Sequence, residues 1–101
     1  MKIGSKQRAY LRKLASSKEA IIRIGKDGIS DNLIDSLDKA LTARELVKVK
    51  VLNNSEENIK EVGYELAKKT KSELIHILGK TAVFFRENIE KPIVSEKLKE
   101  I

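Results

Sequence analysis

Polar and apolar residues alternate most regularly in the middle of the chain. Over Leu46–Val51, three valines fall on one side and Lys48 and Lys50 on the other, with the period of two that a half-buried strand requires. A shorter β-branched run, Ala20–Ile24, stops at Gly25 and also predicts a strand. We therefore expect two strands in the first half of the chain, the second of them with a basic face.

Apolar residues at helical spacing mark three further segments. The first helix is expected to begin at a Ser5 N-cap and to run to about Ala15. A second helix follows an N-cap at Ser30. A third follows the polar cluster Asn53–Ser55 and runs to about Thr70.

Two apolar runs, Leu74–Leu78 and Thr81–Arg86, flank Gly79-Lys80 and predict a β-hairpin. A glycine at the first central position suits a two-residue type II′ turn. Both runs are apolar on both faces, which indicates strands in the middle of a sheet or under cover. The segment after Pro92 is charged, with one helical turn expected at Ser95–Glu100.

The predicted order is α-β-α-β-α-β-β, which indicates an α/β fold. Strands that alternate with helices favour a sheet with parallel pairs, and the hairpin adds an antiparallel pair. We expect a compact two-layer sandwich in which helices pack on a four-stranded mixed sheet. Residues 1–87 would form the domain and residues 88–101 a charged C-terminal tail.

Composition excludes several classes of protein. The chain has 101 residues, no Cys and one His, so one domain is expected, without a zinc finger, an iron–sulfur cluster, a disulfide or a thiol nucleophile. His76 lies within an apolar strand, where a packed side chain is more common than a catalytic base. Asp31, Asp35 and Asp38 recur at helical spacing, which more often marks a solvated face than a metal site. We expect no catalytic residue, metal or cofactor.

Localisation signals are also absent from the pattern. No apolar run reaches the roughly 18 residues of a membrane span. The first fifteen residues lack the apolar segment of a secretory signal. We therefore expect a cytoplasmic protein that does not bind membranes.

Positive charge is concentrated near the N-terminus. The formal net charge is +6, and the first 26 residues hold eight Lys or Arg against a single Glu. Clustered Lys and Arg are typical of proteins that bind polyanions. The alternative is a surface whose charges serve only solubility.

The loop Gly25–Gly28 joins a predicted strand to the start of a helix. Glycines allow positive φ and close backbone approach, and the N–H groups of a helix start attract anions. A Gly-x-x-Gly loop of this kind clamps the nucleic-acid backbone in the KH module. The alternative is an ordinary turn that needs glycines, and Asp27 would repel a phosphate unless its side chain turns away.

Four other basic positions are candidates for contacts with a polyanion. Lys48 and Lys50 would form a basic strip if their sheet face is uncovered, or would protect an edge strand from unwanted pairing. Lys80 lies in the hairpin turn and Arg86 ends the final strand. With two Tyr and two Phe in the chain, a broad base-stacking platform is not expected.

Several motifs occur in one order along residues 3–87 and together resemble a known family. They are Gly4-Ser5-Lys6-Gln7-Arg8-Ala9-Tyr10-Leu11-Arg12, Gly25-Lys26-Asp27-Gly28-Ile29, Glu45-Leu46-Val47-Lys48-Val49-Lys50, Ile77-Leu78-Gly79-Lys80-Thr81 and Phe85-Arg86. This set is similar to the CRM domain, the chloroplast RNA splicing and ribosome maturation domain, in its stand-alone bacterial YhbY-like form.

The resemblance implies an RNA-binding module without enzymatic activity. It implies a fold similar to the C-terminal domain of bacterial translation initiation factor three, and large-subunit ribosomal RNA in assembling particles as the partner. The family's presumed RNA contacts carry over to the loop Gly25–Gly28 and to the basic first helix. This chain has Asp27 where many members have Asn, Arg44 where many have His, and Phe85 where Tyr is common.

We therefore expect a monomeric, non-catalytic protein that binds ribosomal RNA of large-subunit precursors and has no small-molecule substrate. The alternatives are a protein-interaction module whose basic face meets an acidic partner, and a general nucleic-acid binder. The residues expected to contact RNA are Lys6, Arg8, Arg12, Lys13, Gly25, Lys26, Asp27, Gly28, Lys48, Lys50, Lys80 and Arg86.

Overall fold

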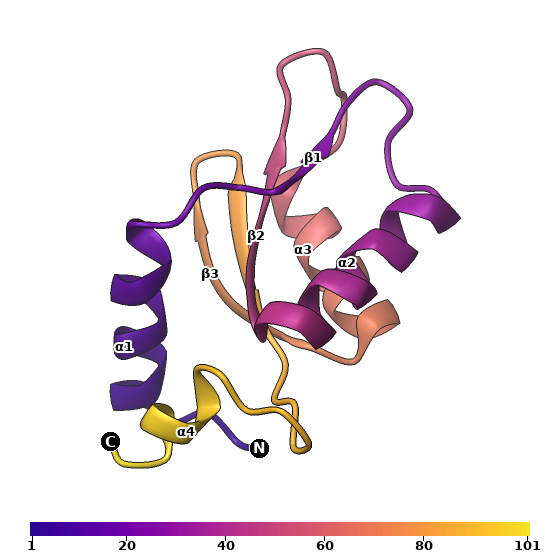
Figure 1. The fold of residues 1–101 in the computed structure, drawn as a ribbon. Helices are drawn as coiled ribbons and strands as arrows, with labels where there is room; N and C mark the ends of the chain where they lie inside the picture. Colours follow the sequence, from indigo (N-terminus) through magenta and orange to yellow (C-terminus); the bar gives the residue numbers. More distant parts are fainter.

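The computed structural model describes residues 1–101 and confirms the α/β class and the predicted order of elements, with one short helix added at the end (Figure 1). The elements are α1 (Ser5–Ser16), β1 (Ile22–Ile24), α2 (Asp31–Arg44), β2 (Leu46–Val51), α3 (Ile59–Thr70), β3 (Glu73–Leu78), β4 (Thr81–Phe85) and α4 (Ser95–Leu98).

The four strands form one mixed sheet in the order β1-β2-β4-β3. β1 and β2 are parallel, and β4 runs antiparallel to β2 and to β3. Because β2 lies between two neighbours, the edge-strand explanation of Lys48 and Lys50 is wrong. The predicted hairpin joins β3, at one edge, to β4 in the interior.

Helices α2 and α3 cover one face of the sheet and enclose the larger core. Leu37 and Leu41 of α2 and Leu66 of α3 are fully buried against the three valines of β2. Phe84 of β4 is the largest side chain in this core and has no exposed surface. Burial of such side chains stabilises a fold by roughly 1.5–3 kcal/mol each, so this layer is the main hydrophobic support of the sheet.

The opposite face carries a second core that α1 and the C-terminal segment share. It contains eight buried residues, namely Leu11, Ala15, Leu46, Ile75, Val83, Phe85, Val94 and Leu98. The expected two-layer sandwich therefore gains a partial third layer, because β3 and β4 present apolar side chains on both faces. In Figure 1, α1 and α4 lie together beside one end of the sheet, on the side away from α2.

Several element boundaries differ from the sequence-based expectation. The N-cap of α1 is Gly4 and not Ser5, and the side chain of Gln7 accepts a hydrogen bond from the Gly4 N–H. Helix α3 begins after Asn58, whose side chain accepts from two main-chain N–H groups, so the predicted start near Ser55 is wrong. The predicted cap at Ser30 is confirmed, since its hydroxyl accepts from the N–H of Leu33.

The turn between β3 and β4 has the predicted geometry. Gly79 has a φ of +59°, whereas Lys80 is not among the residues with positive φ. A positive φ at the first central residue alone distinguishes type II′ from type I′. The predicted helical turn near the C-terminus is also present, as α4.

A buried carboxylate holds the C-terminal segment on the domain. Glu45 follows α2 with a φ of +65° and has no exposed surface. Its oxygens accept hydrogen bonds of 2.6 to 2.9 Å from four main-chain N–H groups and one hydroxyl, which belong to Asn88, Ile93, Val94 and Ser95. No helix combines the length and the apolar composition that crossing a membrane requires.

Burial alone would raise the pKa of Glu45. The hydrogen bonds from Asn88, Ser95 and Ile93 outweigh burial, because they stabilise the charged form, and lower this pKa to about 2. The carboxylate is therefore ionised at neutral pH and serves as the main polar anchor of residues 88–95.

Candidate nucleic-acid interface

Helix α1 presents exposed basic side chains on its outer surface. Lys6, Arg12 and Lys13 are all exposed, while Leu11 and Ala15 of the same helix are buried against the sheet. The amphipathic pattern of the helix explains this division, because the apolar stripe faces the core. Three of the four cations predicted on this helix are therefore directed toward solvent.

The fourth cation of α1, Arg8, is engaged within the fold. One of its guanidinium nitrogens donates to the carbonyls of Leu74 and Ile75, at 2.9 and 2.7 Å, and the other lies 3.9 Å from the carboxylate of Glu73. The register of β3 against β4 shifts between Leu74 and His76, so the bulge frees carbonyls from the ladder. Arg8 satisfies them and ties α1 to the edge strand.

Beyond α1, part of the sheet is left with polar side chains facing outward. Residues directly opposite in a ladder share a face. One row of partners runs Arg23, Lys50, Thr81 and Leu78, and the next runs Lys48, Val83 and His76. Val83 is buried in the second core, and we call the other six residues the open sheet face. Arg23 and His76 were not predicted to belong to the interface, although the alternation of Ile22, Arg23 and Ile24 indicates the side on which Arg23 lies.

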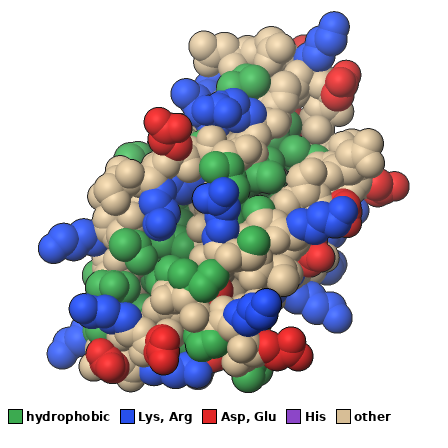
Figure 2. Space-filling view, viewed as in Figure 1, with side chains coloured by type: hydrophobic (Ala, Val, Ile, Leu, Met, Phe, Trp, Pro, Cys, Tyr) green, Lys and Arg blue, Asp and Glu red, His purple; other side chains and the backbone are tan.

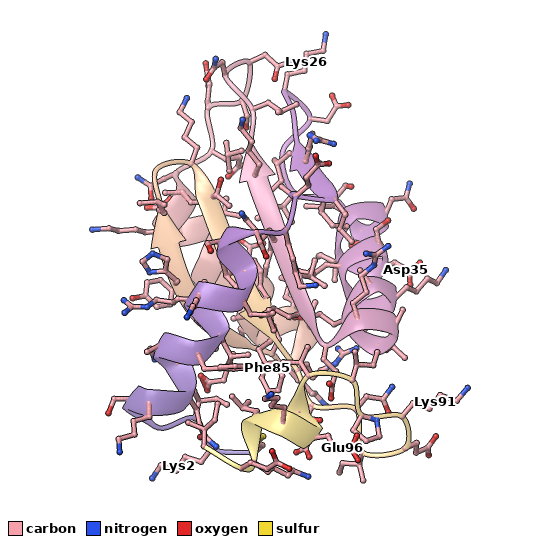
Figure 3. The ribbon with its side chains drawn as sticks, turned by 60° about the vertical axis from the view of Figure 1, so that its left-hand side comes forward. Lys2, Lys26, Asp35, Phe85, Lys91 and Glu96 are labelled. Carbon is pink, nitrogen blue, oxygen red and sulfur yellow. The ribbon has the colours of Figure 1, made fainter.

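The Gly25–Gly28 loop lies at the end of the sheet where β1 and β2 finish. Its turn is closed by a hydrogen bond from the Gly28 N–H to the Gly25 carbonyl, at 3.1 Å. Gly28 has a φ of +67°, and a Cβ there would come within 2.5 Å of a Glu57 oxygen. The positive φ therefore favours glycine at this position, and a larger residue would also have to displace the flexible Glu57 side chain. Lys26 projects from the tip of the molecule, at the end opposite α4 (Figure 3).

Acidic side chains surround the same loop. A shallow cavity beside it is lined by Lys26 and by the three carboxylates of Asp27, Glu56 and Glu57. Lys80, on the neighbouring hairpin, donates to the side chain of Asn53 at 3.2 Å. The loop therefore offers backbone N–H groups and one exposed cation, but carboxylates lie beside them. Its attraction for an anion is weaker than that of the α1 surface.

Arg86 lies apart from the other predicted cations and pairs with α2. Its guanidinium donates to the Asp38 carboxylate at 2.6 Å, to the Thr70 carbonyl at 2.7 Å and to the Thr42 hydroxyl at 2.8 Å. These bonds join the end of β4 to α2 and α3. We leave Arg86 and Arg8 out of the proposed contact surface, because their guanidinium groups already bind partners within the fold.

Two of the three acidic residues of α2 pair with cations of the fold. Asp35 pairs with Lys39 at 2.9 Å, and Asp38 pairs with Arg86. No group of three or more His, Asp or Glu side chains is placed to hold a metal ion. The bond to Asp35 raises the pKa of Lys39.

Figure 2 shows how the charges are distributed on one face of the molecule. Lys and Arg side chains and apolar side chains occupy its middle, and Asp and Glu lie mainly toward its edges. Fold and surface together define a small α/β domain with a basic first helix, a basic open sheet face and a glycine-bearing loop at one tip.

Known proteins share this domain. The CRS1 / YhbY (CRM) domain family matches residues 3–86, so the chain belongs to this family, as its motifs predict. The Bacillus subtilis protein named "Probable RNA-binding protein YqeI" is 41% identical over 88 residues, which are 87% of this chain and 92% of that protein.

Two further comparisons agree with this assignment. A Haemophilus influenzae protein named "RNA-binding protein" is 25% identical over 91 residues, 90% of this chain and 92% of that protein. The solution structure of SAV1595 from Staphylococcus aureus is 42% identical and superposes with a TM-score of 0.73, covering 85% of this chain and 90% of that chain.

Proposed function

We propose that this chain is a non-catalytic, cytoplasmic RNA-binding protein that binds ribosomal RNA of large-subunit precursors and acts in ribosome assembly. RNA binding is supported by the family assignment and by the names of the relatives. The large-subunit precursor is the partner that the resemblance to the YhbY-like proteins implies.

The observation that carries RNA binding is the exposed basic surface that α1 and the open sheet face form together. Lys6, Arg12 and Lys13 come from α1, and Lys50 and Arg23 come from the sheet, all exposed. Cations that neutralise phosphates release counterions, and this release supplies most of the affinity of such surfaces. The proposed contact is therefore chiefly with the RNA backbone.

The Gly25–Gly28 loop extends this surface at the tip of the molecule. Lys26 is exposed there and provides a cation for a phosphate. Close approach of the loop backbone requires the Glu57 side chain to turn away from Gly28, because its carboxylate lies over that residue. The loop is accordingly proposed as a secondary contact, after α1.

Binding measurements with a double variant test this surface. Arg12→Ala combined with Lys26→Ala removes two exposed cations, so affinity for RNA should fall roughly five- to tenfold near 0.1 M salt. The slope of log K against log salt should fall by about one for each cation lost. The melting temperature should stay unchanged, because both side chains are exposed.

The matched control removes the same charge from the opposite face. Lys60→Ala combined with Lys68→Ala takes two exposed cations from α3, and should leave binding unchanged within twofold. Equal losses in the two double variants would show a general basic binder and would contradict the proposed surface.

Crosslinking in cells, with ribosomal particles separated on a gradient and the bound RNA sequenced, tests the partner. One cluster of large-subunit sites in immature particles supports the assembly role. Diffuse recovery across all RNA would contradict it, and recovery of proteins without RNA would indicate a protein-interaction module instead. The α1 and loop double variant should lose the specific cluster.

A further inference from the structure

A small cavity lies between α1 and the open sheet face. Its volume is about 200 Å³, and residues of α1, β2, β3 and β4 line it. The side chains that matter for its chemistry are Arg12, Ser16, Lys48, His76, Leu78 and Thr81. Since four elements meet here, the cavity is built by the tertiary fold.

One side of this cavity suits an anion. Arg12 and Lys48 are cations, and no carboxylate lines the cavity. The Lys48 ammonium donates to the carbonyl of Lys18 at 2.9 Å, which fixes its position. An ammonium has three N–H donors, so two stay available for a ligand. A phosphate placed here meets one positioned cation and one exposed cation.

The other side suits a flat, partly apolar ring. Leu78 is 74% exposed on β3, and the half-buried imidazole of His76 lies on the same face. Nucleobases stack on aromatic rings, including that of His, when they are unpaired. The hydroxyls of Thr81 and Ser16 add polar groups that can donate or accept at a base edge.

The size of the cavity limits what it can hold. Drug-sized ligands occupy pockets of about 300–1,000 Å³, so about 200 Å³ is room for no more than a single nucleotide. We propose that this cavity receives a single unpaired nucleotide of the bound RNA, its phosphate at Arg12 and Lys48 and its base against His76 and Leu78. The proposal rests on the proposed function and adds that the RNA has an unpaired residue at this place.

Binding of single-stranded and duplex RNA tests the cavity. Fluorescence anisotropy would compare a labelled single-stranded 10-mer with a blunt duplex, for wild type, His76→Ala and Leu78→Ala. We expect each variant to lose about five- to tenfold in affinity for the single strand, as loss of a base contact does. Affinity for the duplex should change less than twofold. The salt slope of Leu78→Ala should match wild type, because no cation is lost.

Tyr64→Ala is the matched control. Tyr64 is 70% exposed on α3, so its loss removes an exposed aromatic side chain on the other side of the sheet. It should leave both RNAs bound as in wild type. Melting curves of all variants check that they are folded, which the exposure of Leu78 and Tyr64 favours.

Four results would overturn the cavity assignment. If both variants bind the single strand with wild-type affinity, the cavity is not a nucleotide site, although RNA binding itself still holds. The same conclusion follows if the variants lose affinity equally for the single strand and the duplex. Displacement of the single strand by micromolar adenosine monophosphate would make the cavity a free-nucleotide site. No RNA binding by the wild-type chain would overturn the proposed function together with this inference.

Discussion

Glu45 combines two features that are each costly for a single residue. A side chain other than glycine with positive φ costs roughly 1–2 kcal/mol, and an ionised carboxylate without partners is expensive to bury. Both costs are offset by the five hydrogen bonds that reach its oxygens from residues 88–95. Removing the charge should therefore weaken several bonds at once.

We predict that Glu45→Gln destabilises the chain by about 2–4 kcal/mol at pH 7, since bonds to a charged group are lost and an amide N–H meets main-chain N–H donors. The pKa of Glu45 is about 2 when folded and about 4.5 otherwise. Its contribution to stability is thus present above about pH 4.5 and lost as the pH falls toward 2. The variant should lack this part of the acid dependence.

Urea unfolding at pH 7 and at pH 3 measures both effects. Glu96→Gln, an exposed position on α4, makes the same chemical change and should alter neither. An acid dependence in Glu45→Gln equal to that of wild type would show that the carboxylate is not the group responsible.

Individual residues also show what the sequence cannot reveal. The sequence identifies Arg8 and Arg86 as cations but does not show which groups they bind. Arg8 binds two carbonyls that the bulge in β3 frees from the ladder. Arg86 binds a carbonyl at the end of α3 and a carboxylate on α2. These groups come together only in the folded chain. Sequence reasoning therefore assigns to RNA two cations that the fold itself uses.

Among the elements, the polar contact between α1 and β3 is made by one side chain. Arg8 supplies both donors to the Leu74 and Ile75 carbonyls, and it lies on the helix that carries the proposed RNA contacts. Loss of the Arg8 side chain leaves these two partly buried carbonyls without their charged donor. The orientation of α1 on the sheet thus rests on Arg8 as well as on Leu11 and Ala15.

We predict that Arg8→Met lowers the free energy of unfolding by about 1–3 kcal/mol. Arg12→Met on the same helix, where the side chain is exposed, should change it by less than about 0.5 kcal/mol. Methionine keeps an unbranched apolar chain in both variants, so the comparison isolates the guanidinium. Chemical unfolding gives the answer, and equal stability of the two variants would exclude the anchoring role of Arg8.

The elements were predictable where local chemistry is complete within a few residues. Strict alternation of polar and apolar residues predicts the bounds of β2. The cap at Ser30 and the turn at Gly79 depend only on residues adjacent in sequence. The predicted start of α3 is wrong because Ser55 and Asn58 are both suitable N-cap residues, and the sequence pattern alone does not distinguish them. The partial third layer could not be predicted, since it depends on how the last residues return to the sheet.

For the whole molecule, the C-terminal segment connects parts of the chain that are far apart in sequence. Val94 and Leu98 are buried with Leu11 of α1, and the side chain of Gln7 donates to the Leu98 carbonyl at 3.2 Å. Lys99 pairs with Glu87 at 2.6 Å. The segment thereby supports the position of the helix on which the proposed RNA surface depends.

Truncation after Glu87 tests whether residues 1–87 form a domain by themselves, as the sequence predicts. The structure leads us to expect a loss of roughly 4 kcal/mol or more, because Val94 and Leu98 leave the core and the Glu45 carboxylate loses its partners. Thermal unfolding by circular dichroism measures it. Removal of Glu100 and Ile101 alone should have little effect, and a wild-type melting temperature for residues 1–87 would favour the independent domain.

The bonds that Glu45 accepts come almost entirely from the main chain, so Glu45 itself recognises no side chain between Asn88 and Ile93. Ile89 within it is 82% exposed. The chain has no cysteine, so a thiol introduced at Ile89 would be unique. A fluorophore attached there would report on the chain from the end of the molecule away from Lys26, as the position of the neighbouring Lys91 in Figure 3 shows.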